Sequence, residues 1–503
     1  MAAIFGEAQR ALVVSALALS VGPFSVSTAR AQLIAVKTLR IADGEQFSFF
    51  PSANRGMGGV SIAVRDSIHD LFVNPAKGGW AARSGRSYFF GAPTVFSVSS
   101  KAGGGSTFPA GVVARSGSSF AGAAVAIQSI TDGRRANAIN GGVVLEDQSG
   151  AGGADDSHAN RYAYLMFGRA FAASGLSIAA SGLWSTLGAI DGVNLLYTSS
   201  RSVRQSGGGA DFRLGLLKEW NGGHSFEALL LRRHANMSND VTYMDLYWDP
   251  IRRQTIERSR LQYDGEKSRT SGLHLAYQRV LADSGWRVGA VFTANRLDHL
   301  STPDYEIASF PSDRGRSSAF NLGLGLARTH GGATVAIDAI YEPIWSHLWA
   351  VADSATPSLE SGSRAVDNRL RFSNALLRVG LSQDVELEKK TSLLRLQLGI
   401  QARSVYYSVD QRDIARGATR TGGDDWMEWA RSWGVVYHKP AFEIRYAGRL
   451  TSGGGRPGVL SPSSVAPAPG PISSFRPPPP QSTTTLNDVR VTMHQLSVSL
   501  PVR

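Results

Sequence analysis

Histidine, serine and acidic side chains are where chemistry would be sought first in this 503-residue chain. Ten histidines are dispersed, and none forms an H-x-x-x-H pair beside an acid, so a zinc site is unsupported. The absence of cysteine excludes disulfides and thiolate metal sites. His234 and Ser238 share the segment HANMS, but a hydrolase needs a Ser–His pair with an orienting group, and we expect both residues where a strand ends. We predict no catalytic residue and no enzyme activity.

Two acidic segments, GGADDSHAN and GGDDWMEW, could supply oxygen ligands to Ca²⁺. Their carboxylates belong to Asp155, Asp156, Asp424, Asp425 and Glu428. Neither segment has the alternate-position spacing of a dedicated calcium loop. We interpret both as solvated loop charge and predict no metal and no cofactor.

A third set of charged residues alternates with apolar ones along strand-like runs. A charge facing lipid at mid-membrane costs about 2–4 kcal/mol, so these side chains must face the lumen if the wall crosses a membrane. They are Arg213, Arg287, Arg378, Arg395, Arg403 and Arg445, with Asp211, Asp338 and Glu443. Two interpretations stay open: a positively biased passage for anionic solutes or carboxylate headgroups, and arginine–carboxylate pairs that hold the wall to a segment inside it. We favour the second.

The elements that position these charges are β-strands. In Leu393–Arg403 the apolar residues fall on every second position and the polar residues between them. A period of two places them on opposite faces of a strand, whereas a helix needs spacings of three and four. The runs Phe320–Ala327 and Phe442–Ala447 repeat the pattern.

Short and long connections alternate between these runs. The long ones are expected near Thr131–Asn160, Gly188–Gly208, His234–Lys267, Leu300–Arg316, Ser346–Asp367, Asp410–Glu428 and Thr451–Asn487. Short turns at one rim and long loops at the other are typical of outer-membrane barrels. The pattern predicts an all-β, transmembrane, antiparallel up-and-down barrel of about 14–16 strands. A soluble propeller or sandwich would show short loops throughout and a repeated motif, which the sequence lacks.

Composition narrows the function classes. The net charge of +12 and the pI near 10 come from scattered basic residues, without the basic cluster that nucleic-acid binding needs. The apolar run Ala11–Val21 and the small residues around Arg30 predict a signal peptide over residues 1–31. Export of a barrel places it in the outer membrane of a Gram-negative-type cell. The Gly- and Pro-rich residues 451–485 lack the apolar surface to fold and predict an extracellular loop.

The stretch Phe50–Trp80 is the one part without strand alternation. Pro75 stops a local turn, and Asn74 before it is biased away from helix and can bond its own backbone. The glycines at 56, 58 and 59 begin like a dinucleotide fingerprint, but Ser61 stands at the next glycine position and no αβ unit follows. Glycine suits close approach in a crowded lumen, so the stretch predicts a plug.

The same stretch resembles the N-terminal signature of the FadL-like superfamily, which includes fatty-acid transporters and PorV-type secretion components. The matching residues are Gly56, Gly58, Gly59, Ala63, Asp66, Asn74, Pro75 and Ala76. The resemblance implies a hatch inside a 14-stranded barrel. Lys77 and Gly78 depart from the small apolar residues that usually follow this motif.

We therefore expect residues 1–31 as signal peptide, 32–85 as hatch segment and 86–503 as barrel. The resemblance implies binding or transport of a hydrophobic or amphipathic, fatty-acid-like molecule through a hatch-plugged lumen, in contact with outer-membrane lipid. The alternatives are a PorV-like barrel that binds a secreted protein, and a general porin.

Overall fold

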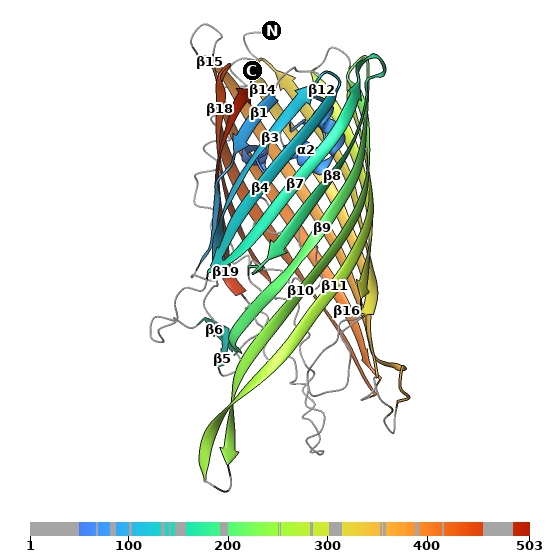
Figure 1. Ribbon diagram of the computed structural model, residues 1–503, viewed down its shortest axis with the longest axis vertical. Helices are drawn as coiled ribbons and strands as arrows, with labels where there is room; N and C mark the ends of the chain where they lie inside the picture. The colour runs from blue at the N-terminus through green and yellow to red at the C-terminus, as the bar shows by residue number, and fades with distance from the viewer. Residues whose placement is uncertain are drawn as a thin grey trace.

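The chain forms a closed β-barrel (Figure 1). The computed structural model describes residues 50–66, 69–80, 87–99, 103–131, 136–139, 142–145, 157–191, 200–249, 251, 253–281, 285–300, 314–352, 355, 359–387, 392–414, 417–455 and 486–502. The expected signal peptide, residues 32–49 and most of the Pro-rich loop lie outside this part.

Seventeen strands form one antiparallel sheet. They are β1 (Ser87–Gly91), β2 (Thr94–Val98), β3 (Gly103–Ser116), β4 (Ser119–Thr131), β7 (Ser157–Phe171), β8 (Leu176–Leu187), β9 (Ser200–Trp220), β10 (His224–Asp249), β11 (Gln254–Val280), β12 (Trp286–Leu300), β13 (Arg314–His330), β14 (Ala333–Val351), β15 (Arg364–Leu387), β16 (Ser392–Asp413), β17 (Ala418–Lys439), β18 (Phe442–Gly455) and β19 (Leu486–Val502). A separate hairpin joins β5 (Ala136–Ile139) and β6 (Gly142–Leu145).

Two consecutive short strands, β1 and β2, close the ring. Both pair with β19 on one side and β3 on the other, so they share a single position interrupted at Ala92–Pro93. The described wall therefore has sixteen positions, which is the upper value of the 14–16 strands predicted from the pattern and two more than the fourteen that the family resemblance implies. Every other strand pairs with the wall strands that precede and follow it, with the β5–β6 hairpin inserted between β4 and β7, as in an up-and-down barrel.

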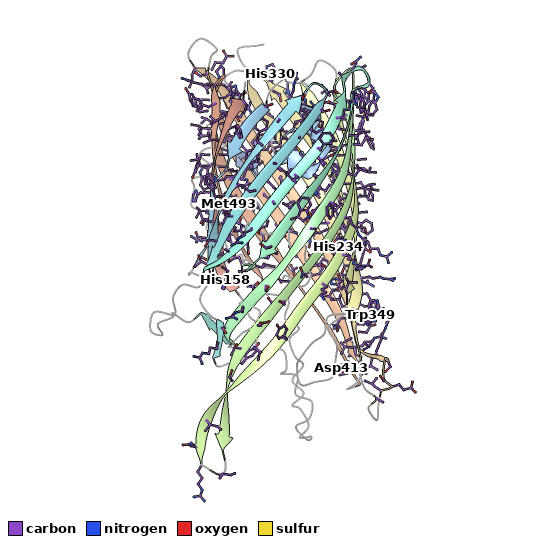
Figure 2. The ribbon with its side chains drawn as sticks, in the orientation of Figure 1. His158, His234, His330, Trp349, Asp413 and Met493 are labelled. Atoms are coloured by element: carbon purple, nitrogen blue, oxygen red, sulfur yellow. The ribbon has the colours of Figure 1, made fainter. Side chains whose placement is uncertain are left out.

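Alternation assigns the two faces of the wall. On β13, Leu322 and Leu324 are 50% and 68% exposed, whereas Gly323 between them lies beneath Ile62. Large apolar side chains are exposed on strand after strand in this way, and Figure 2 shows side chains projecting from the outside of the wall. Because an apolar outer face on this scale is stable only in lipid, the barrel is transmembrane.

As the alternation of connections predicts, short turns follow β3, β7, β9, β13 and β17 at one rim, where His330 lies (Figure 2). Two predicted long loops are wrong. His234–Lys267 lies within the paired strands β10 and β11, and Asp410–Glu428 largely within β16 and β17. Gly188–Gly208 is also shorter than expected, because β9 begins at Ser200. Strands that continue into water keep their backbone pairing but need no apolar face, so period two disappears from the sequence before the strand ends.

The stretch Phe50–Trp80, called the inner segment from here on, contains the 3₁₀ helices η2 (Arg55–Met57) and η3 (Pro75–Lys77) and the helix α2 (His69–Val73). Figure 1 shows α2 behind the wall, in the half of the barrel that carries the short turns. No helix among the described residues is long and apolar enough to span a membrane.

Candidate functional site

The contacts of the inner segment with the wall form the candidate site. Two parts of it meet strands on opposite sides of the ring: Gly58 contacts β16 and β17, while Asn74 contacts β9 and β10. The rings of Phe50 and Phe72 stack with centroids 3.9 Å apart, and Phe72 also contacts Phe90 of β1 and Tyr164 of β7. The segment thus crosses the lumen.

Glycines on both partners permit the contact at the η2 end. Gly58 has a φ of 73°, which disfavours other residues, and its amide donates to Ser432 Oγ at 2.8 Å. A Cβ placed on Gly399 of β16 would lie 2.0 Å from the Gly58 nitrogen. Gly56 makes a similar close contact with Gly434, whereas a Cβ on Gly59 would meet nothing.

The Asp338 carboxylate of β14 holds the next turn of the segment. Asp338 is fully buried, and its Oδ2 accepts hydrogen bonds from the amides of Ser61 at 2.7 Å and Ile62 at 3.2 Å. Arg378 of β15 donates to the Gly59 carbonyl at 3.2 Å. Both residues predicted to face the lumen therefore bind the backbone of the inner segment.

The Asn74-Pro75-Ala76 corner forms the other end. Asn74 Oδ1 accepts from the Ala76 amide at 3.1 Å, which caps η3 as the sequence predicts. Its Nδ2 donates to Glu227 of β10 at 3.0 Å. The corner fits closely against the wall, since a Cβ on Gly215 would lie 2.0 Å from Asn74 Oδ1.

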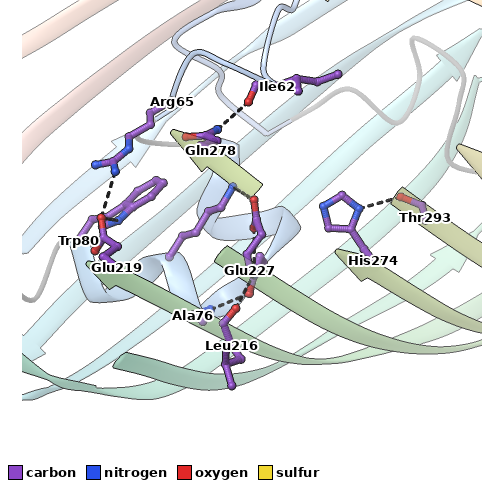
Figure 3. A network of polar contacts seen from close by, with 12 residues as sticks. Ile62, Arg65, Ala76, Trp80, Leu216, Glu219, Glu227, His274, Gln278 and Thr293 are labelled. Carbon is purple, nitrogen blue, oxygen red and sulfur yellow. Dashed lines mark hydrogen bonds and ion pairs between the residues drawn. The ribbon is translucent and has the colours of Figure 1, made fainter. Parts of the chain in front are cut away.

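Lys77, which departs from the family motif, forms a buried ion pair. Its Nζ lies 3.0 Å from Glu227 Oε1, and both side chains are 9% exposed. Figure 3 shows Glu227 among the surrounding polar contacts, with His274 hydrogen-bonded to Thr293 at 2.7 Å nearby. The alternation of residue types on β10 is consistent with an inward Glu227, but only the structure shows that Lys77 is its partner.

Arg213 of β9 closes the end of α2. Its Nη1 donates to the carbonyls of Phe72 and Val73 at 2.9 Å each, and Asp211 accepts two bonds from the same guanidinium. The last carbonyls of a helix lack partners within it, so this arginine satisfies them.

Asp66 organises the segment internally. Its carboxylate accepts from Ser52 Oγ at 2.5 Å and from the amides of Ala53 and Asn54 at 3.0 and 3.2 Å. The carboxylate therefore joins the two sides of the loop that carries the glycines.

A cavity of about 440 Å³ lies between the inner segment and the short-turn rim of β11–β18; we call it the rim cavity. The segment contributes Met57, Ala63, Val64 and Arg65 to it, and the wall contributes Arg287, Arg395, Arg445 and Glu443. Sequence alternation places these wall charges inside but does not show that they share one cavity.

Most of the remaining predicted charges are paired along the wall. Arg395 binds Asp384 through Nε and Nη2 at 2.6 and 2.8 Å, and Arg403 lies 3.2 Å from Glu342. Arg445 pairs with Glu443.

The other candidate groups are not brought together. His234 and Ser238 lie within β10, four residues apart on one face, so about 13 Å of strand separates them. Asp425 and Glu428 lie within β17 and, three residues apart, face opposite sides. Asp155 and Asp156 are outside the described residues.

Sequence reasoning missed several polar wall residues that bind the segment. Gln278 Nε2 donates to the Ile62 carbonyl at 2.8 Å, and Gln397 Nε2 donates to Ala53 at the same distance (Figure 3 shows the first). Together with Glu227 and Ser432 they occupy inward positions. Their place in the alternation along each strand could therefore have identified them as lumen residues. They were not predicted as lumen residues because three of them are uncharged and Glu227 is a single charge within an apolar run.

No family model and no curated protein matches this chain. Solved structures similar to it include a FadL homologue of Pseudomonas aeruginosa, with 12% identity, a TM-score of 0.44 and coverage of 90% of this chain and 98% of that one. The Pseudomonas putida toluene transporter TodX has 11% identity, a TM-score of 0.39 and coverage of 94% and 99%.

A third similar structure is CdiB from Acinetobacter baumannii, with 8% identity, a TM-score of 0.39 and coverage of 82% of this chain and 60% of that one. Identities and TM-scores this low assign no function, and what the chain itself establishes is a transmembrane barrel whose lumen is crossed by its N-terminal segment.

Proposed function

We propose that this chain is an outer-membrane barrel that passes a hydrophobic or amphipathic small molecule through its lumen, with the inner segment as a hatch. The crossing of the lumen carries the proposal: the segment contacts β9 and β10 at one end and β16 and β17 at the other. The named function of TodX, a toluene transporter, supports the same class of solute.

The contacts suit a hatch that can move. At the η2 end the segment is held by backbone hydrogen bonds to Ser432, Asp338 and Arg378, beside the rim cavity. Such bonds contribute about 0.5–3 kcal/mol each, so a few can be broken when a solute binds. An open water-filled porin needs no such segment.

Two measurements test the proposal. In planar bilayers the wild-type barrel should conduct weakly, and a variant lacking Phe50–Trp80 should conduct strongly and steadily. In Gram-negative cells that lack their own fatty-acid transporter, the wild-type barrel should increase uptake of labelled dodecanoate, and the deletion should change that uptake. Uptake equal to vector-only cells, or unchanged by the deletion, would refute transport through the hatch.

The projecting β10–β11 hairpin favours a second candidate, a barrel that binds a secreted protein. These strands span 26 and 27 residues and extend beyond the rest of the wall in Figure 1. A variant in which Asn239–Asp264 is replaced by a short turn separates the two candidates, since transport should survive it and partner binding should not.

A further inference from the structure

We propose that the outer face of the wall at the short-turn rim binds the phosphate groups of acidic phospholipids, through four cations that each lie over an aromatic ring. The pairs are Arg169 with Phe171, Lys218 with Trp220, Arg328 with Trp286 and Lys439 with Tyr437, each cation 5.3 to 5.6 Å from the ring centroid. We call these eight residues the basic belt. It lies on the opposite face of the wall from the inner segment, so the inference goes beyond the proposed transport and does not depend on it.

Strand geometry produces the pairs. In three of them the cation and the ring are two residues apart on β7, β9 or β17, and residues two apart share one face of a strand. In the fourth, Trp286 of β12 lies directly opposite Arg328 of β13 in the ladder. The belt therefore recurs on several strands of the ring, always at the short-turn rim.

The belt lies where the apolar outer face ends. On β13, the exposed Leu324 and Leu326 share the face that Arg328 continues, and on β7 the exposed Phe167 is followed on its face by Arg169. Aromatic rings of barrels gather at the level of the lipid headgroups. Lysine and arginine stems lie along apolar surface while the charge reaches a polar group. The cations of the belt are therefore at the level of the lipid phosphates.

No carboxylate in the described part of the chain balances these charges on the outer face of the rim. The acidic residues in the last few positions before the rim fall on inward positions of their strands. They are Glu219, Glu227, Asp384, Glu386 and Glu443. The outer face of this rim is therefore cationic, and the anion that a membrane presents there is the phosphate of an acidic lipid.

The cations keep donors for a phosphate. Arg169 and Arg328 are exposed, and neither has an ion pair with any residue that the structure describes. Lys218 donates one hydrogen bond, to the Ser174 carbonyl, which leaves two of its three N–H donors. A ring beneath each cation restricts its rotamers, so less conformational freedom is lost when a phosphate binds.

Native mass spectrometry of the purified full-length barrel in detergent tests this, with phosphatidylglycerol titrated against phosphatidylcholine of the same acyl chains. The wild type should bind phosphatidylglycerol at least about fivefold more tightly, the factor that one lysine or arginine beside an anionic lipid contributes. Added salt should reduce this preference, because exposed charges are screened.

The triple variant Arg169→Gln/Lys218→Gln/Arg328→Gln should lose most of the preference and bind phosphatidylcholine as the wild type does. Arg328→Gln alone should weaken phosphatidylglycerol binding at least about twofold.

The matched control is Arg161→Gln/Arg232→Gln/Arg431→Gln. It removes the same charge from exposed positions on β7, β10 and β17 that lie farther from the short-turn rim. It should keep the preference for phosphatidylglycerol, and heat-dependent migration on gels verifies that each variant folds.

Equal wild-type affinity for the two lipids, no effect of Arg328→Gln, or an equal loss of preference in the two triple variants would each overturn the proposal. So would displacement of phosphatidylglycerol by an equal concentration of glycerol 3-phosphate, since the belt would then bind free phosphate anions rather than a lipid. Uptake of dodecanoate is measured separately, so failure of the belt leaves the transport proposal standing.

Discussion

Two regions of the inner segment, called here its anchored end and its cavity end, are held by different chemistry. The anchored end, Asn74–Trp80, meets β9 and β10 through the buried Lys77–Glu227 ion pair and the Asn74 side chain. The cavity end, Gly56–Val64, meets β11–β17 mainly through its own backbone and lies against the rim cavity. One end depends on a desolvated charge pair and the other on hydrogen bonds and close glycine contacts.

This difference indicates which end can move. Separating Lys77 from Glu227 leaves two buried charges without partners, which costs several kcal/mol. Separating the cavity end breaks single hydrogen bonds, and the adjacent space can admit water or solute to replace them. We therefore expect a hatch that pivots on its anchored end.

The largest effect should come from Glu227→Gln, which leaves the Lys77 ammonium buried without its counter-charge. We expect a loss of about 3–5 kcal/mol in the free energy of unfolding, measured by urea titration of the barrel in lipid vesicles. The double variant Lys77→Met/Glu227→Met should recover most of the loss, because a buried pair can be replaced by apolar residues at little cost. A single variant with under about 1 kcal/mol of loss would contradict the anchored end.

A smaller effect is expected from Asp338→Asn at the cavity end. Its Oδ2 accepts from two backbone amides of the segment, and losing the charge should cost about 1.5–3 kcal/mol. More open events in planar bilayers should accompany that loss. Asp298→Asn is the control, because its exposed pairs with Arg296 and Arg316 should contribute about 0–1 kcal/mol. Equal losses of stability in Asp338→Asn and Asp298→Asn would contradict a specific role for Asp338 in holding the cavity end.

The smallest effect should come from Gly399→Ala, which adds a Cβ against the Gly58 nitrogen. Overpacking of this kind costs about 1–3 kcal/mol, and it should displace the cavity end and raise conductance. Gly422→Ala on β17 meets nothing within 4 Å and should change stability by no more than about 0.5 kcal/mol. Unchanged conductance in Gly399→Ala would mean that the cavity end can shift without opening the lumen.

Much of the wall was predictable from residues such as Leu322 and Leu324. Lipid requires an apolar outer face, and an apolar residue at every second position identifies that face in the sequence. The same parity placed Asp338 and Arg378 inside. It failed over His234–Lys267 and Asp410–Glu428, where the strands run on beyond the lipid. There the backbone hydrogen bonds to the neighbouring strand set the pairing, and these bonds do not depend on residue type.

By itself the sequence determined a barrel, its short turns, the inward side of several strands and a corner at Asn74-Pro75, since these depend on local alternation and backbone preference. The tertiary structure alone decided which inward group meets which part of the inner segment. In the sequence, Lys77 is only a departure from the FadL-like motif. Its ion-pair partner, Glu227, lies 150 residues away in the chain. Arg287, Arg395 and Arg445 come from three strands and share one cavity only because the wall closes on itself. Such long-range contacts depend on closure of the barrel, which no local sequence pattern predicts.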